Sequence, residues 1–246
     1  FDVAISSDGT SLYVPGHNDH ALAVFSRNAT TGKLTYVEAQ TGLTGARSVV
    51  VSPGGKHVYV ARQEDDTLSV FSRDTTSGAL TLIENHIDGA AGVEGLDGAL
   101  PVLISPDGNH VYLSGSFEHS LAIFRRDPGT GKLTYLERIQ DGVDGALGLH
   151  EAAGATISPD GRHLYFANSP TNTVSAYRRD FNAHTVTLGK NALLDGLNFV
   201  NQLPSLVALD DSYTIANDAA LVRPQLLLRA KDFNGVPNWA ALGSGS

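Results

Sequence analysis

The sequence contains neither cysteine nor methionine in its 246 residues, and it has a single tryptophan. Without cysteine there is no thiol nucleophile, no disulfide and no cysteine-ligated zinc site. A chain that offers no thiol or thioether to oxidants suits an oxidising environment, although cytoplasmic proteins also lack disulfides. We therefore expect an extracellular, periplasmic or cell-surface location.

Long apolar runs and basic stripes are missing as well. No run approaches the roughly 18 residues that a membrane-spanning helix needs. The chain has 17 basic and 26 acidic side chains, which gives a formal net charge of −9. Because affinity for nucleic acid comes largely from clustered lysine and arginine, we expect neither a nucleic-acid partner nor a membrane span. The sequence also lacks a Gly-x-Ser-x-Gly elbow, a phosphate loop and a His-Glu-x-x-His motif.

One unit of sequence is repeated along the chain. It reads roughly as an apolar strand, Ser-Pro-Asp-Gly, apolar-Tyr-apolar, a polar turn, Leu-x-Val-Phe-x-Arg-Asp, Thr-Gly and Leu-Thr-apolar. The glycine that closes its first turn recurs at Gly9, Gly55, Gly108 and Gly161. Four short β-like runs in a period of about 50 residues are typical of a β-propeller blade.

The repeat predicts an all-β fold, a β-propeller built of four-stranded antiparallel blades, in a single domain over residues 1–242. Five units are visible, four clear and one degenerate. They span about 1–37, 38–83, 84–136, 137–188 and 189–242, and a flexible Gly/Ser tail follows at 243–246. Three alternatives stay open: a five-bladed ring, part of a larger ring such as one of seven blades, or two blades supplied by sequence outside these residues.

Features present in every copy are interpreted as structural. The repeated tyrosines and phenylalanines are expected to fill the core between sheets. The repeated Arg-Asp pairs are expected to cap the turn after the third strand by hydrogen bonding and by pairing with each other. These pairs are Arg73-Asp74, Arg126-Asp127 and Arg179-Asp180.

Departures from the repeat are better candidates for a functional site, because an asymmetric ligand needs an asymmetric site. Just before the innermost strand of the fourth unit, His150 stands beside Glu151, where the third unit has Asp97 and Gly98. Arg47 occupies a nearby position in the second unit. We expect these positions at one mouth of the central channel, where His150, Glu151 and Arg47 form a candidate acid/base and oxyanion set. The alternative is that they only hydrogen-bond across blades.

Two linkers combine glycine with carboxylates, whose oxygens suit a hard cation. We consider calcium as a ligand there, against the alternative of plain Gly-rich turns, since neither linker has EF-hand spacing. No other cofactor is expected. The candidate ligands are Asp88, Glu94, Asp97, Asp141 and Asp144.

Four segments resemble the lactonase-type β-propeller family, which includes 6-phosphogluconolactonase-like enzymes and YVTN-repeat surface proteins. Similar units also build secreted bacterial proteins of tandem repeats. The segments are 105–112, 158–165, 68–74 and 121–127. The resemblance implies a ring that usually closes seven blades, which at about 50 residues each needs roughly 350 residues. It also implies hydrolysis of a lactone.

Two main functions remain open. The first, which we rank higher, is a noncatalytic extracellular module that binds protein or glycan at a rim or channel mouth, or assembles with further copies on a surface. The alternative is a lactone hydrolase resembling 6-phosphogluconolactonase, in which water attacks the lactone carbonyl at the channel mouth. A phosphorylated substrate would call for several basic groups, and among the inner strands only Arg47 is evident. A neutral lactone therefore fits the alternative better.

Overall fold

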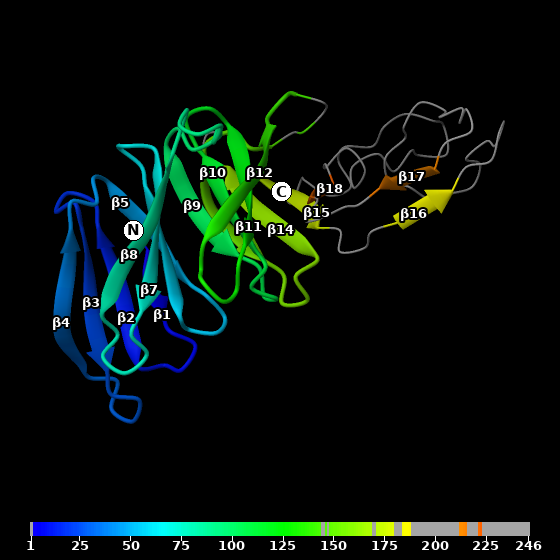
Figure 1. Ribbon diagram of the computed structural model, residues 1–246. Coiled ribbons are helices and arrows are strands. Elements are labelled where there is room, and N and C mark those ends of the chain that lie inside the picture. The colour runs from blue at the N-terminus through cyan, green and yellow to red at the C-terminus, as the bar shows by residue number, and fades with distance from the viewer. Residues whose placement is uncertain are drawn as a thin grey trace.

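The computed structural model describes residues 2–143, 146, 148–168 and 171–179, together with the backbone of three short strands that follow. Every regular element in this part of the chain is a β-strand. Four antiparallel sheets of four strands each follow one another through space in chain order (Figure 1). The predicted all-β fold with four-stranded blades is therefore confirmed. No helix in the described residues is long and apolar enough to cross a membrane.

We call the four sheets blades 1 to 4. Blade 1 consists of β1 (Ala4–Ile5), β2 (Ser11–Gly16), β3 (Ala21–Arg27) and β4 (Leu34–Thr41). Blade 2 consists of β5 (Ala46–Val51), β6 (His57–Arg62), β7 (Thr67–Arg73) and β8 (Leu80–Ile87). Blade 3 consists of β9 (Ala99–Ile104), β10 (His110–Gly115), β11 (Ser120–Arg126) and β12 (Leu133–Gln140). Blade 4 consists of β13 (Ala152–Ile157), β14 (His163–Asn168), β15 (Thr173–Arg179) and β18 (Leu221–Val222).

The outer strand of blade 4 differs from the prediction. The predicted fourth unit ends at about residue 188, yet β16 (His184–Thr187) pairs with β17 (Ser212–Ile215) in a separate two-stranded sheet. The fourth position of blade 4 is filled instead by β18, which lies inside the predicted fifth unit. Most of residues 189–242 and the Gly/Ser tail lie outside the described residues, so a fifth blade stays a prediction.

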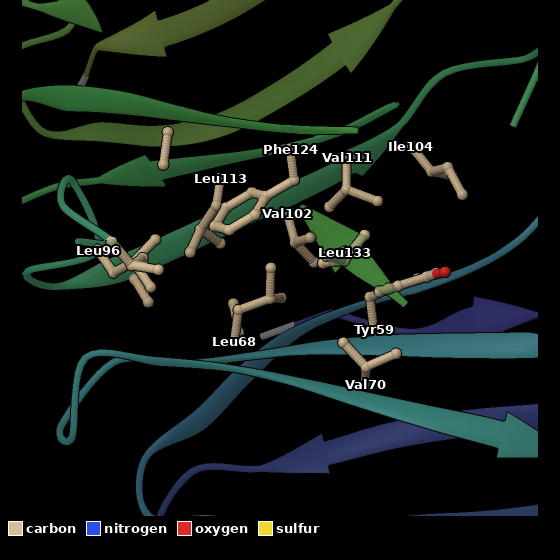
Figure 2. Close-up of a cluster of buried hydrophobic side chains, with 14 residues drawn as sticks. Tyr59, Leu68, Val70, Leu96, Val102, Ile104, Val111, Leu113, Phe124 and Leu133 are labelled. Atoms are coloured by element: carbon tan, nitrogen blue, oxygen red, sulfur yellow. The ribbon is translucent and has the colours of Figure 1, made fainter. Parts of the chain in front are cut away.

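Each blade packs face to face against its neighbours, because alternate residues of a strand point to opposite sides of the sheet. We call the side turned to the preceding blade the leading face and the other side the trailing face. Figure 2 shows the contact of blades 2 and 3, where Tyr59, Leu68 and Val70 on a trailing face meet Val111, Leu113 and Phe124 on a leading face. Equivalent apolar clusters join blades 1 and 2 and blades 3 and 4. The predicted core role of the repeated aromatics is thereby confirmed for Tyr13, Tyr59, Tyr112, Phe71, Phe124 and Tyr177, which are at most 1% exposed, whereas Phe25 and Tyr165 are partly exposed.

Arg73 and Arg126 do not pair with the aspartates that follow them, Asp74 and Asp127, which corrects the predicted turn cap for these two pairs. Asp180 lies outside the described residues. Arg73 reaches back to blade 1, where it donates to Asp8 (3.0 Å) and to the Tyr13 hydroxyl (2.8 Å). Arg179 likewise donates to Asp107 of blade 3 at 2.7 Å. The aspartate of the pair does cap the turn, since Asp74 accepts the backbone amides of two turn residues at 2.8 Å each. The arginine therefore joins blades, while the aspartate closes the local turn.

Candidate functional site

A cavity of about 390 Å³ lies between the innermost strands β5, β9 and β13. Its polar side chains are Asp2, Arg47 and Ser48, and the other described lining residues are apolar or glycine. The innermost strands contact one another directly, which places the cavity on the central channel of the propeller. This is the position where the repeat pattern predicts a ligand.

Arg47 brings a positive charge to this cavity. Its guanidinium donates to the side-chain oxygen of Gln63, a neutral amide. In the described part of the chain, Arg47 forms no ion pair with a carboxylate. Leu100 and Ala153 hold the matching positions of blades 3 and 4 and also line the cavity, so the symmetry of the inner strands is broken at this arginine. A half-buried cation of this kind suits an anionic group or a carbonyl oxygen that gains negative charge.

A short hydrogen-bond relay runs beside Arg47. The amide of Val102 donates to Ser48 Oγ (3.2 Å), and Ser48 Oγ donates to Asp2 Oδ2 (2.8 Å). Asp2 Oδ2 also accepts the amide of Val49 at 3.0 Å. Sequence reasoning missed Asp2 and Ser48, although a signal existed. They share one position of the repeat with Pro101 and Gly154, and only the first two blades have a polar residue there.

His150 and Glu151 lie in the loop before β13 and do not line the cavity. The His150 ring stacks on His119 with centroids 3.9 Å apart and planes 15° from parallel. The Glu151 amide donates to Nδ1 of His119 at 3.3 Å. The three residues predicted as one site therefore occupy two places, with Arg47 in the cavity and the His-Glu pair against His119.

The contact between Glu151 and His119 is the blade 4 version of a repeated structural link. In blade 2 the Gly45 amide donates to His20 Nδ1 (3.1 Å), and in blade 3 the Gly98 amide donates to Asp66 Oδ1 (2.8 Å). Glu151 has a φ of 46° where the other two positions are glycines with φ of 65° and 72°. A left-handed backbone is unfavourable for a glutamate, and such strain is concentrated at functional positions.

Several predicted calcium ligands are engaged in other contacts. Asp88 accepts the amide of Leu96 (2.9 Å), Asp141 accepts the amide of Leu149 (3.3 Å), and Glu94 pairs with Arg138 at 3.5 Å. Asp144 lies outside the described residues. Within those residues, no three histidine, aspartate or glutamate side chains are grouped so that they could hold a metal ion. Calcium binding stays a prediction.

Carboxylates gather in the loops before β7, β9 and β11, although Arg138 offsets part of this charge by pairing with Glu118 at 3.0 Å. Burial raises the pKa of Asp97, and the neighbouring carboxylates of Asp66 and Asp88 raise it further. Burial also raises the pKa of Glu118, with Asp88 as the next cause. This group of carboxylates repels anionic molecules that approach these loops and attracts cationic molecules.

Comparison with protein families gives one match of functional interest. The model of the family described as "Lactonase, 7-bladed beta-propeller" matches residues 2–96 and 89–194. A comparison with curated proteins gave no match.

Solved structures agree with the family match. A candidate 6-phosphogluconolactonase from Bacteroides uniformis is 23% identical, with a TM-score of 0.61, 73% of this chain covered and 50% of that chain. The periplasmic gluconolactonase PpgL of Pseudomonas aeruginosa is 25% identical, with a TM-score of 0.59, 72% of this chain covered and 49% of that chain. The chain thus spans about half the length of these structures.

Proposed function

Because the chain belongs to the lactonase family of seven-bladed β-propellers, we propose that it hydrolyses a lactone at the central cavity. The observation that carries this proposal is the family match, which runs through all four described blades. It favours the lactonase alternative over the noncatalytic module that ranks first on sequence grounds. The cavity on the channel, with its single cation and its hydrogen-bond relay, supplies a place for the reaction.

The proposed reaction is the attack of water on the lactone carbonyl. The water oxygen bonds to the carbonyl carbon, the ring C–O bond breaks, and the released oxygen takes up a proton to give a hydroxy acid. We assign Arg47 to the carbonyl oxygen, because a guanidinium held in a partly enclosed site stabilises the oxyanion of the tetrahedral intermediate. The same charge would hold the carboxylate of the product.

We assign the removal of the proton from water to Asp2, because its carboxylate lines the cavity together with Arg47. Asp2 accepts hydrogen bonds from Val3, Ser48 and Val49, and a carboxylate has acceptor capacity beyond these three. His150 does not line the cavity and its Nδ1 is buried, so we do not assign it to this step.

A neutral lactone is the proposed substrate class. Arg47 is the one cation on the described lining, and Asp2 lines the same cavity. A phosphorylated sugar would bring about two negative charges at neutral pH to a channel whose rim is acidic. We also propose that the protein is exported to the periplasm. This is supported by its similarity to a periplasmic gluconolactonase and by its lack of cysteine and methionine.

The test is base uptake at constant pH with a panel of neutral and phosphorylated lactones. We expect turnover of a neutral lactone, and a decrease of about 100-fold in kcat/KM for Arg47→Gln, the scale measured for the loss of one oxyanion donor. Arg125→Gln, which removes an exposed arginine of β11, should leave kcat/KM unchanged. A folded protein that turns over no lactone would contradict this proposal and favour the noncatalytic binding module.

A further inference from the structure

Backbone amides of the innermost strands are bonded in the same way where blade 1 meets blade 2 and where blade 2 meets blade 3. In both places, an amide of one blade donates to a side chain of the blade before it. The Val49 amide of blade 2 donates to Asp2 Oδ2 at 3.0 Å, and the Val102 amide of blade 3 donates to Ser48 Oγ of blade 2 at 3.2 Å. Asp2 and Ser48 share one position of the repeat, and Val49 and Val102 share the next position.

This bond is missing where blade 3 meets blade 4. Ala155 has the repeat position of Val102, and Pro101 has the repeat position of Ser48. A proline side chain has no hydrogen-bond acceptor, so Pro101 cannot receive the Ala155 amide. Among the described residues, no side chain or loop carbonyl accepts a hydrogen bond from this amide.

The Ala155 amide points toward the channel. Ala155 pairs with Phe166 of β14 in the same register as Val102 pairs with Leu113 of β10. Opposed residues of antiparallel strands alternate between pairs that exchange hydrogen bonds and pairs that do not. Val102 belongs to a pair of the second kind, because its amide donates to Ser48 instead. The N–H of Ala155 therefore points away from β14, and Ala155 lines the cavity.

The free amide does not arise from the limits of the described structure. Its acceptor would come from the preceding blade, and blade 3 is packed against blade 4. The lining from β9 and β13 has no polar side chain, so an oxygen atom of a ligand competes only with water for this donor. Backbone amides rarely stay without an acceptor in folded proteins, which favours a ligand at this position.

We propose that the Ala155 amide donates a hydrogen bond to an ester oxygen of the bound lactone. This inference rests on the proposed function, and it adds a second donor to the cavity that Arg47 lines. An ester group has two oxygens that accept hydrogen bonds and none that donates. A backbone amide is held in place by its strand, so it stabilises charge on such an oxygen without reorganisation. As an uncharged donor, it also suits a neutral lactone.

Amide hydrogen exchange of an isotope-labelled sample tests whether this donor is free. Without ligand, we expect the Ala155 amide to exchange at least about tenfold faster than the Val102 amide, because Val102 has an acceptor in the protein. Ser48→Ala removes that acceptor and should raise the exchange rate of Val102 toward that of Ala155. An Ala155 amide that exchanges as slowly as Val102 in the wild type would overturn the proposal.

Titration with δ-valerolactone, with hydrolysis followed in the same sample, tests the bound state. We expect the proton resonance of the Ala155 amide to move downfield as the lactone binds. Pro101→Ser places a hydroxyl where it can accept the Ala155 amide, as Ser48 accepts Val102. The dissociation constant of this variant should be about three- to tenfold higher than that of Pro101→Ala. Pro101→Ala is the matched control, because both substitutions remove the proline ring and only one adds an acceptor.

The results separate this proposal from the proposed function. An Ala155 resonance that does not move, or equal dissociation constants for Pro101→Ser and Pro101→Ala, would overturn the binding role of Ala155 even if the lactone is hydrolysed. A resonance that moves without hydrolysis would support the binding role and contradict the lactonase. Each variant must first show the native circular dichroism spectrum. If Pro101→Ser does not fold, the exchange and the resonance of Ala155 in the wild type still decide.

Discussion

Arg126 of blade 3 lies against His57 of blade 2, with Nη2 of the arginine 2.8 Å from Nδ1 of the imidazole. An arginine can only donate, so Nδ1 of His57 accepts and the ring is neutral. The Asp-Gly turn that places Asp8 in blade 1 and Asp107 in blade 3 is Gly54-Gly55 in blade 2. The equivalent His110 of blade 3 also lies 2.6 Å from Nη2 of Arg179, next to Asp107. The difference in blade 2 is that His57 meets Arg126 without an aspartate from the turn.

This contact predicts an acid-sensitive interface. Burial lowers the pKa of His57, and the charge of Arg126 lowers it further. The unfolded chain, with a histidine pKa of about 6.5, binds the proton more readily than the folded chain. The stabilisation is complete above about pH 6.5 and is lost as the pH falls from there toward the lowered pKa of folded His57.

Thermal unfolding at about pH 7.5 and pH 5.5 measures this effect. We expect the difference in Tm between the two pH values to be smaller for His57→Gln than for the wild type. His17→Gln, at a rim histidine paired with Glu64, serves as the matched control. An equal pH dependence in wild type and His57→Gln would contradict the prediction.

The arginines that join neighbouring blades should contribute unequally to the free energy of unfolding. Arg73 donates hydrogen bonds to Asp8, Thr10, Ser11, Tyr13 and Gly55. Its replacement by alanine leaves polar groups unpaired at a buried interface and should cost about 3 kcal/mol in the free energy of unfolding.

Urea denaturation of dilute protein measures the loss in the free energy of unfolding for these arginine variants. Arg27→Ala, at the equivalent position of blade 1 with a single described bond, should cost about 1 kcal/mol. Similar losses for the two variants would show that the bonds of Arg73 to blade 1 do not stabilise the fold.

Gly131 should be among the least replaceable residues of the repeated turn. It has a φ of +77°, and a Cβ atom there would lie 2.2 Å from the ring of His57. Gly32 occupies the same turn in blade 1 with a φ of +72° and nothing within 4 Å of a Cβ. Gly32→Ala should cost about 1 kcal/mol for the backbone alone, and Gly131→Ala about 1 to 3 kcal/mol more because of the clash. Comparable midpoints in urea for the two variants would contradict this difference.

Glu151→Gly tests whether strain is retained for function. Glycine accepts a φ of 46° without cost, so the variant should be about 1 kcal/mol more stable than the wild type while its kcat/KM on a lactone falls. Glu137→Gly, in strand β12, should instead lose about 0.5 to 1 kcal/mol. A Glu151→Gly variant that is more stable and equally active would show that the glutamate has no part in the reaction.

Much of the fold can be predicted because its signals are local. The short apolar runs in β2 and β6 and the turn glycines Gly55 and Gly108 mark each strand and turn within a few residues of sequence. Arg47 was predictable as a channel residue for the same reason, since aligned repeats reveal a charge where the other blades have Leu100 and Ala153.

The candidate site was predictable only in part, because its contacts join distant residues. Asp2 meets Ser48 across two blades, and His119 is the residue that receives His150 and Glu151. Nothing in the nearby sequence indicates that these residues meet, because both contacts depend on how one blade packs against the next.

The amino-acid sequence by itself determined the strands, the turns and the faces of each blade, because periodicity and backbone preference act between near neighbours. Only the tertiary structure decided the partners of the polar groups. It directed Arg73 to Asp8 rather than to Asp74, and it placed Arg47 in the cavity away from His150. The physical reason is that hydrogen bonds and ion pairs need partners within about 3 Å, and the packing of whole blades sets which groups come that close.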